Sequence, residues 1–262
     1  MKTPTYSKEL AVAKKIAAKS GKIMLKYFDN DQAVEVKGDK SLVTIADKLI
    51  NTMVIKELRK VFPKDIVIGE EESTGEYGMG RRWICDPIDG TAGYVWGTPT
   101  AMFSIALVVD GVPVVGVLYD PFLKLLYTGV KGGKSFCNKK VLKVSNKQMN
   151  KGIFGLTGSV KHLDERKYWS ALKTSGARFA AFSGAVYKYA LIARGRLVGY
   201  IEAGLNPHDV AASHVILENA GSKVTDLYGK TLDYTKPFKG AIASNGVVHD
   251  TLVGYAQMDI ES

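Results

Sequence analysis

The sequence predicts an α+β protein, because helices come first and the strands that follow them are joined by hairpins. Apolar residues recur at helical spacing in residues 7–28, while lysines occupy the other faces. Residues 101–109 and 113–119 form two β-rich runs separated by Asp110-Gly111, a typical hairpin turn. This order favours layered α and β elements over a doubly wound parallel sheet.

A second helix is predicted within residues 42–61. Thr44 is followed three residues later by Asp47, which is the spacing of a capping box with Asp in place of Glu. Pro63 ends this helix because proline cannot continue one. The apolar face of the helix is predicted to contain Leu49, Met53 and Leu58.

Short strands are predicted at residues 66–68 and 83–85, and each is followed by acidic residues. Residues 125–130 continue the hairpin pattern. In the second half, strands are predicted at residues 153–156, 177–182 and 199–201, and helices at residues 168–174, 185–193 and 209–220. Because the order of predicted helices and strands differs between the two halves of the chain, we expect two subdomains, residues 1–140 and residues 141–262.

Composition excludes several classes of protein. With 262 residues, of which 46% are apolar and 24% charged, the chain is expected to form a sizeable core rather than a fibrous or disordered structure. Its two cysteines, Cys85 and Cys137, do not make a disulfide framework and fit a reducing compartment. No segment approaches the roughly 20 apolar residues that span a bilayer, so we expect a cytoplasmic protein without a membrane partner.

The net charge of +10 allows nucleic-acid binding as an alternative function. The lysines are scattered, however, and no compact basic-aromatic motif of a recognised binding module is present. We therefore interpret the charge as a solvated basic surface that attracts an anionic substrate, and a nucleic-acid partner is not expected.

Four acidic residues stand at the ends of predicted elements. Glu70 follows one apolar run, Asp86 and Asp89 follow another, and Asp209 begins a helix. Carboxylates placed in this way can converge on one site, and several of them cannot all remain ionised there without a cation. Carboxylate oxygens are ligands that suit Mg²⁺.

The stretch from Asp86 to Thr91 is the most informative in the chain. Proline fixes the backbone between the two acids, and the bend can turn the Ile88 carbonyl inward as a further ligand. Gly90 allows a close approach to an anion, and Thr91 is predicted to cap a short helix whose N–H groups could bind phosphate. The alternative is a surface turn, since Asp-Pro and Asp-Gly are common turn pairs.

These residues resemble the inositol monophosphatase family over residues 7–256. The motifs that carry the resemblance are Trp83-Ile84-Cys85-Asp86-Pro87-Ile88-Asp89-Gly90-Thr91, Asp209-Val210-Ala211-Ala212, Gly69-Glu70-Glu71 and Leu42-Val43-Thr44-Ile45-Ala46-Asp47. The resemblance implies an αβαβα sandwich of the inositol monophosphatase and fructose-bisphosphatase type. It also implies a homodimer and inhibition by Li⁺.

The resemblance further implies roles for single residues. Two or three Mg²⁺ ions would be held by Glu70, Asp86, Ile88, Asp89 and Asp209. Glu70, Thr91 and Asp47 would be catalytic, with Thr91 and Asp47 orienting the attacking water. Substrate would be bound by Gly90, Thr91, Ser183, Gly184, Ala185 and Glu202.

The expected reaction is hydrolysis of a small phosphate monoester by metal-activated water. Inositol monophosphate is the favoured substrate. Histidinol phosphate, fructose 1,6-bisphosphate and 3′-phosphoadenosine 5′-phosphate are the alternatives. Residues 202–209 look like the histidinol-phosphate branch, but Ala185 stands where that branch usually has an Asp, which argues against that substrate.

Overall fold

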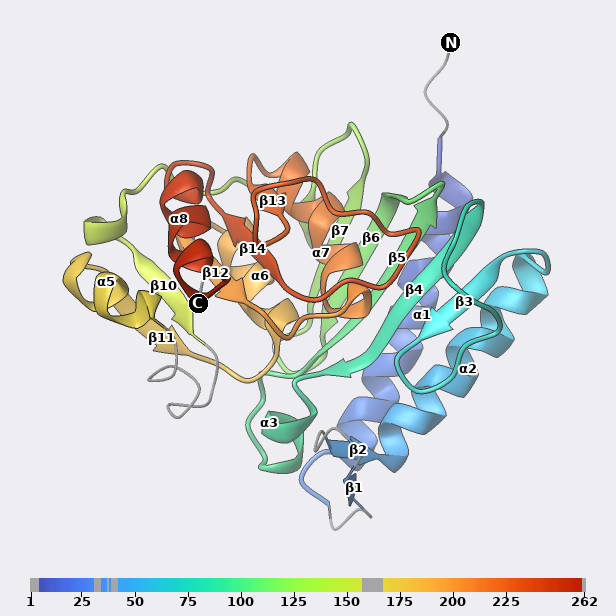
Figure 1. Cartoon of the computed structure of the whole chain (residues 1–262). Helices are drawn as coiled ribbons and strands as arrows, with labels where there is room; N and C mark the ends of the chain where they lie inside the picture. Colours follow the sequence, from blue (N-terminus) through green and yellow to red (C-terminus); the bar gives the residue numbers. More distant parts are fainter. Residues whose placement is uncertain (1–4, 31–33, 37, 39–41, 157–166, 261–262) are drawn as a thin grey trace.

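The computed structural model describes residues 5–30, 34–36, 38, 42–156 and 167–260. Helices and sheets alternate in five layers, α–β–α–β–α (Figure 1). The layered α+β fold predicted from the sequence is therefore confirmed. Among the described residues, no helix combines the length and the apolar character that crossing a bilayer requires.

The larger sheet has seven strands in the order β3-β4-β5-β6-β7-β8-β9. β3 and β4 are parallel, and every other neighbouring pair is antiparallel. The hairpin predicted at Asp110-Gly111 joins β5 to β6, and both turn residues have positive φ. The strands are β3 (Ile66–Gly69), β4 (Arg81–Asp89), β5 (Met102–Val109), β6 (Val112–Asp120), β7 (Leu125–Val130), β8 (Phe136–Cys137) and β9 (Lys140–Val141).

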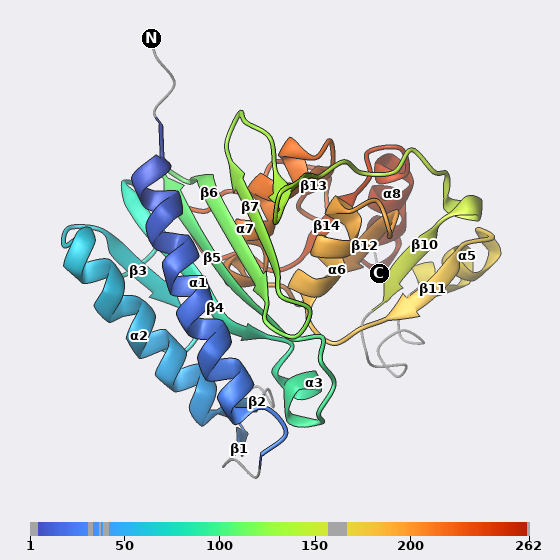
Figure 2. The same ribbon diagram turned by 180° about the vertical axis from the view of Figure 1, so that it is seen from behind.

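One face of this sheet is covered by α1 (Ser7–Tyr27) and α2 (Ile45–Val61), which lie side by side (Figure 2). The predicted capping box starts α2, with Thr44 as the N-cap. A small hairpin of β1 (Val34–Val36) and β2 (Leu42–Thr44) precedes α2. The predicted apolar face of α2 is partly wrong: Leu58 is buried, but Leu49 is 42% exposed, and Ile50 and Val54 face the core instead.

The central layer consists of α6 (Ala185–Ala193) and α7 (Pro207–Asn219), which lie between the two sheets. Gly116 of β6 faces the Ala212 carbonyl of α7, and a side chain there would collide with it. The second sheet has the order β11-β10-β12-β14-β13, and α5 (Tyr168–Thr174) and α8 (His249–Ile260) cover its outer face. Its strands are β10 (Ile153–Leu156), β11 (Arg178–Ala181), β12 (Gly199–Glu202), β13 (Lys223–Thr225) and β14 (Ala241–Ser244).

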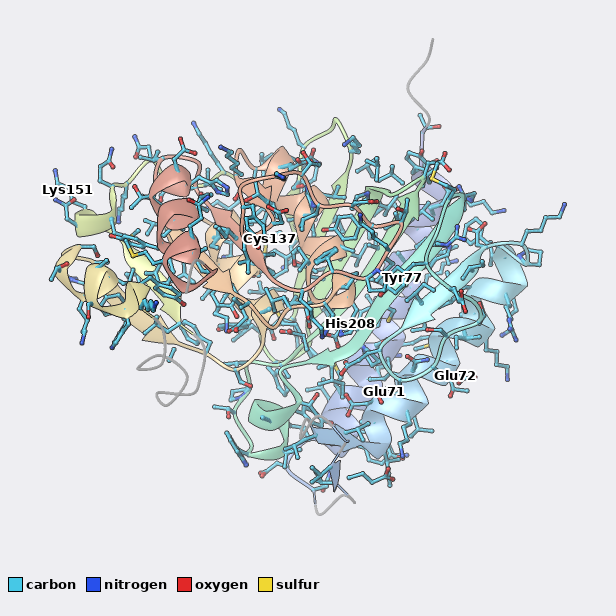
Figure 3. All side chains as sticks on the ribbon, in the orientation of Figure 1. Glu71, Glu72, Tyr77, Cys137, Lys151 and His208 are labelled. Atoms are coloured by element: carbon cyan, nitrogen blue, oxygen red, sulfur yellow. The ribbon has the colours of Figure 1, made fainter. Side chains whose placement is uncertain are left out.

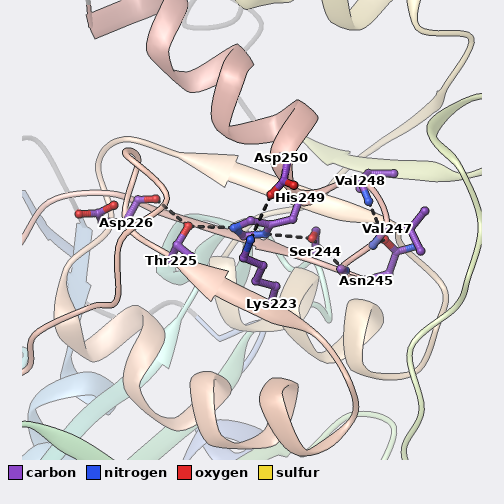
Figure 4. A network of polar contacts seen from close by, with 10 residues as sticks. Lys223, Thr225, Asp226, Ser244, Asn245, Val247, Val248, His249 and Asp250 are labelled. Atoms are coloured by element: carbon purple, nitrogen blue, oxygen red, sulfur yellow. Dashed lines mark hydrogen bonds and ion pairs between the residues drawn. The ribbon is translucent and has the colours of Figure 1, made fainter.

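A buried histidine joins α8 to this second sheet (Figure 4). His249 Nε2 lies 2.9 Å from the Thr225 hydroxyl of β13, and its Nδ1 lies 3.0 Å from the Ser244 hydroxyl of β14. Burial lowers the pKa of His249 to about 4, so the ring is neutral at physiological pH. The network is therefore structural, because each ring nitrogen already has a hydroxyl partner.

Candidate active site

Three aspartates meet between the two halves of the chain. Asp86, Asp89 and Asp209 each place a carboxylate oxygen within 4.8 Å of the others. Two of them come from β4 and the third from α7, which packs against β4, β5 and β6. The predicted convergence of these three acids is thus observed.

The end of β4 sets the spacing of the first two carboxylates. β4 continues through Asp89, whereas the sequence predicted a strand that stops before Asp86. Asp86 pairs with Ser104 and Asp89 with Met102, and the register shifts between them. Because proline has no N–H to donate to the ladder, Pro87 lies where the regular pairing is interrupted.

Asp209 lies in the first turn of α7 rather than at its first residue. The helix begins at Pro207, with Asn206 as its N-cap. The Asn206 N–H donates to Asp209 Oδ2 at 2.6 Å. This hydrogen bond fixes one carboxylate oxygen and leaves the other, Oδ1, 3.8 Å from His208 Nε2.

The N-terminus of α6 holds Asp89. The Ala185 N–H donates to Asp89 Oδ1 at 2.8 Å, and the Val186 N–H donates to Oδ2 at 2.9 Å. The free N–H groups of a helix start favour a negative charge at this place. Ala185 is buried, and its N–H is engaged by Asp89 in this structure.

The N-cap of α6, Gly184, has φ +79° and packs directly against Asp89 and Gly90. The Ser183 hydroxyl accepts a hydrogen bond from the Gly93 N–H at 3.0 Å. The predicted substrate residues Ser183, Gly184 and Ala185 therefore hold the Asp86–Thr91 segment in place. Their contact with a substrate stays a prediction.

Gly90 and Thr91 lie at the start of α3 (Thr91–Val95). Gly90 is the N-cap with φ +87°, and Thr91 is the first helical residue, so the prediction that Thr91 caps this helix is wrong. Only glycine adopts this left-handed conformation without strain, which explains the residue choice. The Thr91 hydroxyl instead donates to the Ile88 carbonyl at 2.9 Å and lies 3.5 Å from Asp47 Oδ1.

Asp47 is buried beside Thr91. Its Oδ2 accepts hydrogen bonds from the Thr44 N–H at 2.8 Å and from the Thr44 hydroxyl at 2.6 Å. Burial raises the pKa of Asp47 to about 7, and the charges of Glu70 and Glu71 contribute in the same direction. The structure thus brings together Asp47 and Thr91, the predicted pair.

The remaining two predicted acids lie at strand ends. Glu70 follows β3, and its N–H donates to the Cys85 carbonyl at 3.1 Å. Its charge is one cause of the raised pKa of Asp86, so it lies near the three aspartates. Glu202 ends β12 and accepts a hydrogen bond from the Tyr200 hydroxyl at 3.3 Å.

The three aspartates repel one another in a buried space. Burial raises the pKa of Asp86 well above its usual value, and the charges of Glu70, Asp89 and Asp209 raise it further. Burial and the charge of Asp209 raise the pKa of Asp89 to about 7. Among the described residues, no hydrogen-bond donor reaches Asp86 Oδ1. A divalent cation satisfies these requirements, because it neutralises the carboxylates and accepts the unpartnered oxygen as a ligand.

Comparisons with known proteins agree with this geometry. A sequence model described as the inositol monophosphatase family matches residues 5–261. The chain belongs to the inositol monophosphatase family. A fructose-1,6-bisphosphatase/inositol-1-monophosphatase of Thermotoga maritima is 32% identical over 91% of this chain and 92% of its own. An inositol monophosphatase of Solanum lycopersicum is also 32% identical, over 86% and 87%.

Two further comparisons, one of sequence and one of structure, also match members of this family. A Nus factor SuhB of Salmonella typhimurium is 31% identical, over 84% of this chain and 85% of its own. A solved inositol monophosphatase of Thermotoga maritima superimposes with a TM-score of 0.88 at 29% identity, covering 97% of this chain and 98% of its own. Family membership makes the protein a phosphoric monoester hydrolase.

Within this family framework, the structure adds a buried lysine that sequence reasoning did not assign to the site. Lys188 is 2% exposed, and its Nζ donates to the Phe182 carbonyl at 3.0 Å and lies 4.3 Å from the centre of the Tyr200 ring. Burial lowers the pKa of Lys188 to about 8, and the charges of Asp89, Glu202 and Asp209 oppose that shift. Nothing in the sequence around Lys188 indicates that its side chain is buried.

Tyr77 and His208, which are labelled in Figure 3, both interact electrostatically with Asp209. Burial raises the pKa of Tyr77 to about 12, and the charge of Asp209 contributes. Tyr77 lies in a glycine-rich stretch of the sequence that indicated no role for it. Glu71 and Glu72 lie beside α2 in the same view, and Glu72 is exposed.

Replacing Gly184 by alanine is expected to lower kcat by roughly 10²-fold, because the new Cβ would collide with the Asp89 carboxylate and displace it. Gly132→Ala is the matched control. Gly132 has a similar φ of +77°, and a Cβ added to it would meet no atom within 4 Å. Both variants are assayed for kcat and for thermal midpoint. An equal loss of activity in the two would show that backbone strain, and not Asp89, is responsible.

Proposed function

We propose that this protein hydrolyses a small phosphate monoester with the help of Mg²⁺ bound at the three aspartates. The observation that carries the proposal is Asp86, which has a carboxylate oxygen within 4.8 Å of those of Asp89 and Asp209 and whose buried Oδ1 has no hydrogen-bond donor in the described part of the chain. Clustered carboxylates of this kind fit a hard divalent cation that prefers oxygen ligands.

In this proposal, Asp86, Asp89, Asp209 and Glu70 would hold two or three metal ions, together with the Ile88 carbonyl. Bound Mg²⁺ would lower the pKa of a water molecule and neutralise phosphate oxygens. The protein's own residues would orient the water and bind the phosphate. Thr91 and Asp47, whose oxygens lie 3.5 Å apart, would orient the attacking water, and the N–H groups at Gly90 and Thr91 would bind the phosphate.

The favoured substrate is inositol monophosphate. Relatives named inositol monophosphatase support this choice, and one relative also bears the name fructose-1,6-bisphosphatase. Glu202, at the end of β12, would accept a hydrogen bond from a substrate hydroxyl. Ala185 offers no charge for a cationic imidazole, so histidinol phosphate is the weaker candidate.

A phosphate-release assay tests the proposal. The panel contains inositol 1-phosphate, histidinol phosphate, fructose 1,6-bisphosphate and 3′-phosphoadenosine 5′-phosphate, each with Mg²⁺ and with Mg²⁺ plus chelator. We expect chelator-sensitive turnover that is highest for inositol 1-phosphate and that Li⁺ inhibits. Turnover that survives the chelator would reject the metal-dependent mechanism. A higher rate with another compound would reject the substrate assignment alone. We also expect a homodimer, which light scattering measures.

Replacing Lys188 by methionine is expected to lower kcat at least tenfold. The Phe182 carbonyl would lose its donor just before the start of α6, where the Ala185 and Val186 N–H groups hold Asp89. The half-saturating Mg²⁺ concentration should fall, because a positive charge near the carboxylates is removed. Lys173→Met is the control, since that lysine is exposed and also lies over a ring, 5.5 Å from Trp169. A kcat and Mg²⁺ dependence unchanged by Lys188→Met would contradict the role.

A further inference from the structure

The positive charge of the protein is concentrated in its outer helical layer. α1 and α2 together contain ten lysines and arginines and only three acidic residues, a net charge of +7 out of the +10 of the whole chain. One of the three acids, Asp47, is buried at the active site, and another, Glu9, is paired with Arg81. The outer surface of this layer is therefore strongly basic.

On α1 the lysines form one stripe. At 100° per residue, five of them fall within an arc of about 60° that runs the length of the helix. All five are exposed, on the side of α1 opposite the buried residues Ala13, Ala17 and Met24. These lysines are Lys8, Lys15, Lys19, Lys22 and Lys26.

On α2 apolar side chains lie between the basic ones. Ile45 and Leu49 are each 42% exposed, and Met53 continues their spacing of four residues. They belong to a shallow hollow of about 510 Å³ along α2. Its lining contains Ile45, Lys48, Leu49, Thr52, Met53, Lys56, Glu57 and Lys60. An ion pair between Lys19 and Glu57 joins the hollow to the lysine stripe of α1.

We propose that the outer face of α1 and α2 is a docking surface for an anionic lipid bilayer. Lysines around exposed aliphatic residues fit such a surface, because the ammonium groups contact phosphate headgroups while Ile45 and Leu49 enter the apolar boundary. This is peripheral binding and needs no membrane-spanning helix. It also revises the expectation of a protein without a membrane partner.

Two other occupants fit the face less well. The phosphate backbone of a nucleic acid offers no apolar partner for the exposed side chains of Ile45 and Leu49. The two helices carry nine lysines and one arginine, but no exposed aromatic residue on which bases could stack. A second copy of the chain would bring one strongly basic face against another, and like charges repel.

The docking face and the active site use opposite sides of α2. Asp47 points into the protein and contacts Thr44 and Thr91, whereas its neighbours Lys48 and Leu49 are exposed. Docking would therefore bring the site close to the bilayer without using any of its residues. The inference does not depend on which phosphate ester is the substrate.

Cosedimentation with vesicles tests the proposal at about 0.15 M salt. The probes are vesicles of phosphatidylcholine with about one third phosphatidylserine, and vesicles of phosphatidylcholine alone. The variant K15Q/K22Q/K56Q/R59Q removes four exposed charges of the face. We expect it to bind the anionic vesicles several hundredfold more weakly than the wild type, roughly fivefold for each charge. We expect no binding of the wild type to the neutral vesicles.

The variant K131Q/K134Q/K139Q/K140Q is the matched control. It removes the same number of positive charges, from exposed lysines in and beside β8 and β9. These two strands form the end of the larger sheet that lies furthest from β3. We expect it to bind anionic vesicles much more tightly than the α1/α2 variant does. Equal weakening in both variants would overturn the assignment to this face. Circular dichroism and phosphate release confirm that both variants are folded.

Leu49→Gln and a duplex RNA probe separate lipid from nucleic acid. We expect the Leu49→Gln variant to bind anionic vesicles several-fold more weakly, because an exposed aliphatic side chain is lost. Binding to duplex RNA that depends on the four α1/α2 charges, together with no binding to anionic vesicles, would overturn the proposal in favour of a nucleic-acid partner.

Discussion

Replacing Asp86 by asparagine is expected to lower kcat/KM by roughly three orders of magnitude or more. The carboxylate lies within 4.8 Å of those of Asp89 and Asp209, and no donor among the described residues reaches its Oδ1. An amide keeps the shape but removes the charge that holds a cation. Phosphate release over a range of Mg²⁺ concentrations measures the effect.

The same substitution is expected to raise the thermal midpoint of the metal-free protein. Burial raises the pKa of Asp86, and the charges of Glu70, Asp89 and Asp209 add to the shift, so a neutral side chain removes the cost of burying a carboxyl group here. Asp120→Asn is the matched control, since Asp120 is also buried but accepts hydrogen bonds from the Phe122 and Leu123 N–H groups at 2.9 Å. It should keep activity, because Asp120 is not one of the three clustered aspartates. An Asp86→Asn enzyme with near wild-type activity would reject the metal site.

Signals between residues close in the chain predicted the elements well. Thr44 and Asp47 predicted the start of α2, and the structure shows their capping box. Asp110-Gly111 predicted the hairpin of β5 and β6. The range of α6, residues 185–193, was also correct, since Gly184 and Gly195 stand just outside its two ends. Local propensity is sufficient where caps and turns mark both ends.

Several elements that depend on contacts distant in the chain were not predicted. β14 lies between β12 and β13, and its four residues carry no alternation because all of them are buried. β8, β9, β13 and α8 were missed for related reasons, because they are short or stabilised by contacts such as the His249 network. The strand of residues 83–85 was too short because Pro87 argues against a regular ladder, although the structure continues past it with a shift of register.

Some features of the candidate site could be predicted from residues close in the chain, and others depend on contacts between distant residues. The motif around Asp86 and Asp89 predicted that these two acids share one site, because their spacing is local. The hydrogen bonds from Ala185 and Val186 to Asp89 join residues almost a hundred positions apart. The burial of Lys188 depends on Gly155, whose missing side chain leaves room for the lysine stem. Such contacts follow from the packing of the two sheets on α6, which periodicity does not specify.

The stability of the metal-free protein is expected to fall as the pH rises from about 4 to about 7. Burial raises the pKa of both Asp47 and Asp89 from 3.8 to about 7 in the folded protein. In this window the unfolded chain has lost these protons and the folded chain still binds them, so folding becomes less favourable with rising pH. The slope is at most about 1.4 kcal/mol per pH unit for each carboxyl group.

Mg²⁺ should reverse this loss, because a bound cation favours the ionised carboxylates that burial disfavours. We expect Mg²⁺ to raise the thermal midpoint by about 5–10 °C at pH 8 and by little at pH 5, measured by calorimetry with and without chelator. Asp89→Asn removes one of the titrating groups and should flatten both dependences. A Mg²⁺ effect of equal size at the two pH values would mean that the cation binds elsewhere. A pH profile unchanged by Asp89→Asn would mean that other groups set the stability of the metal-free site.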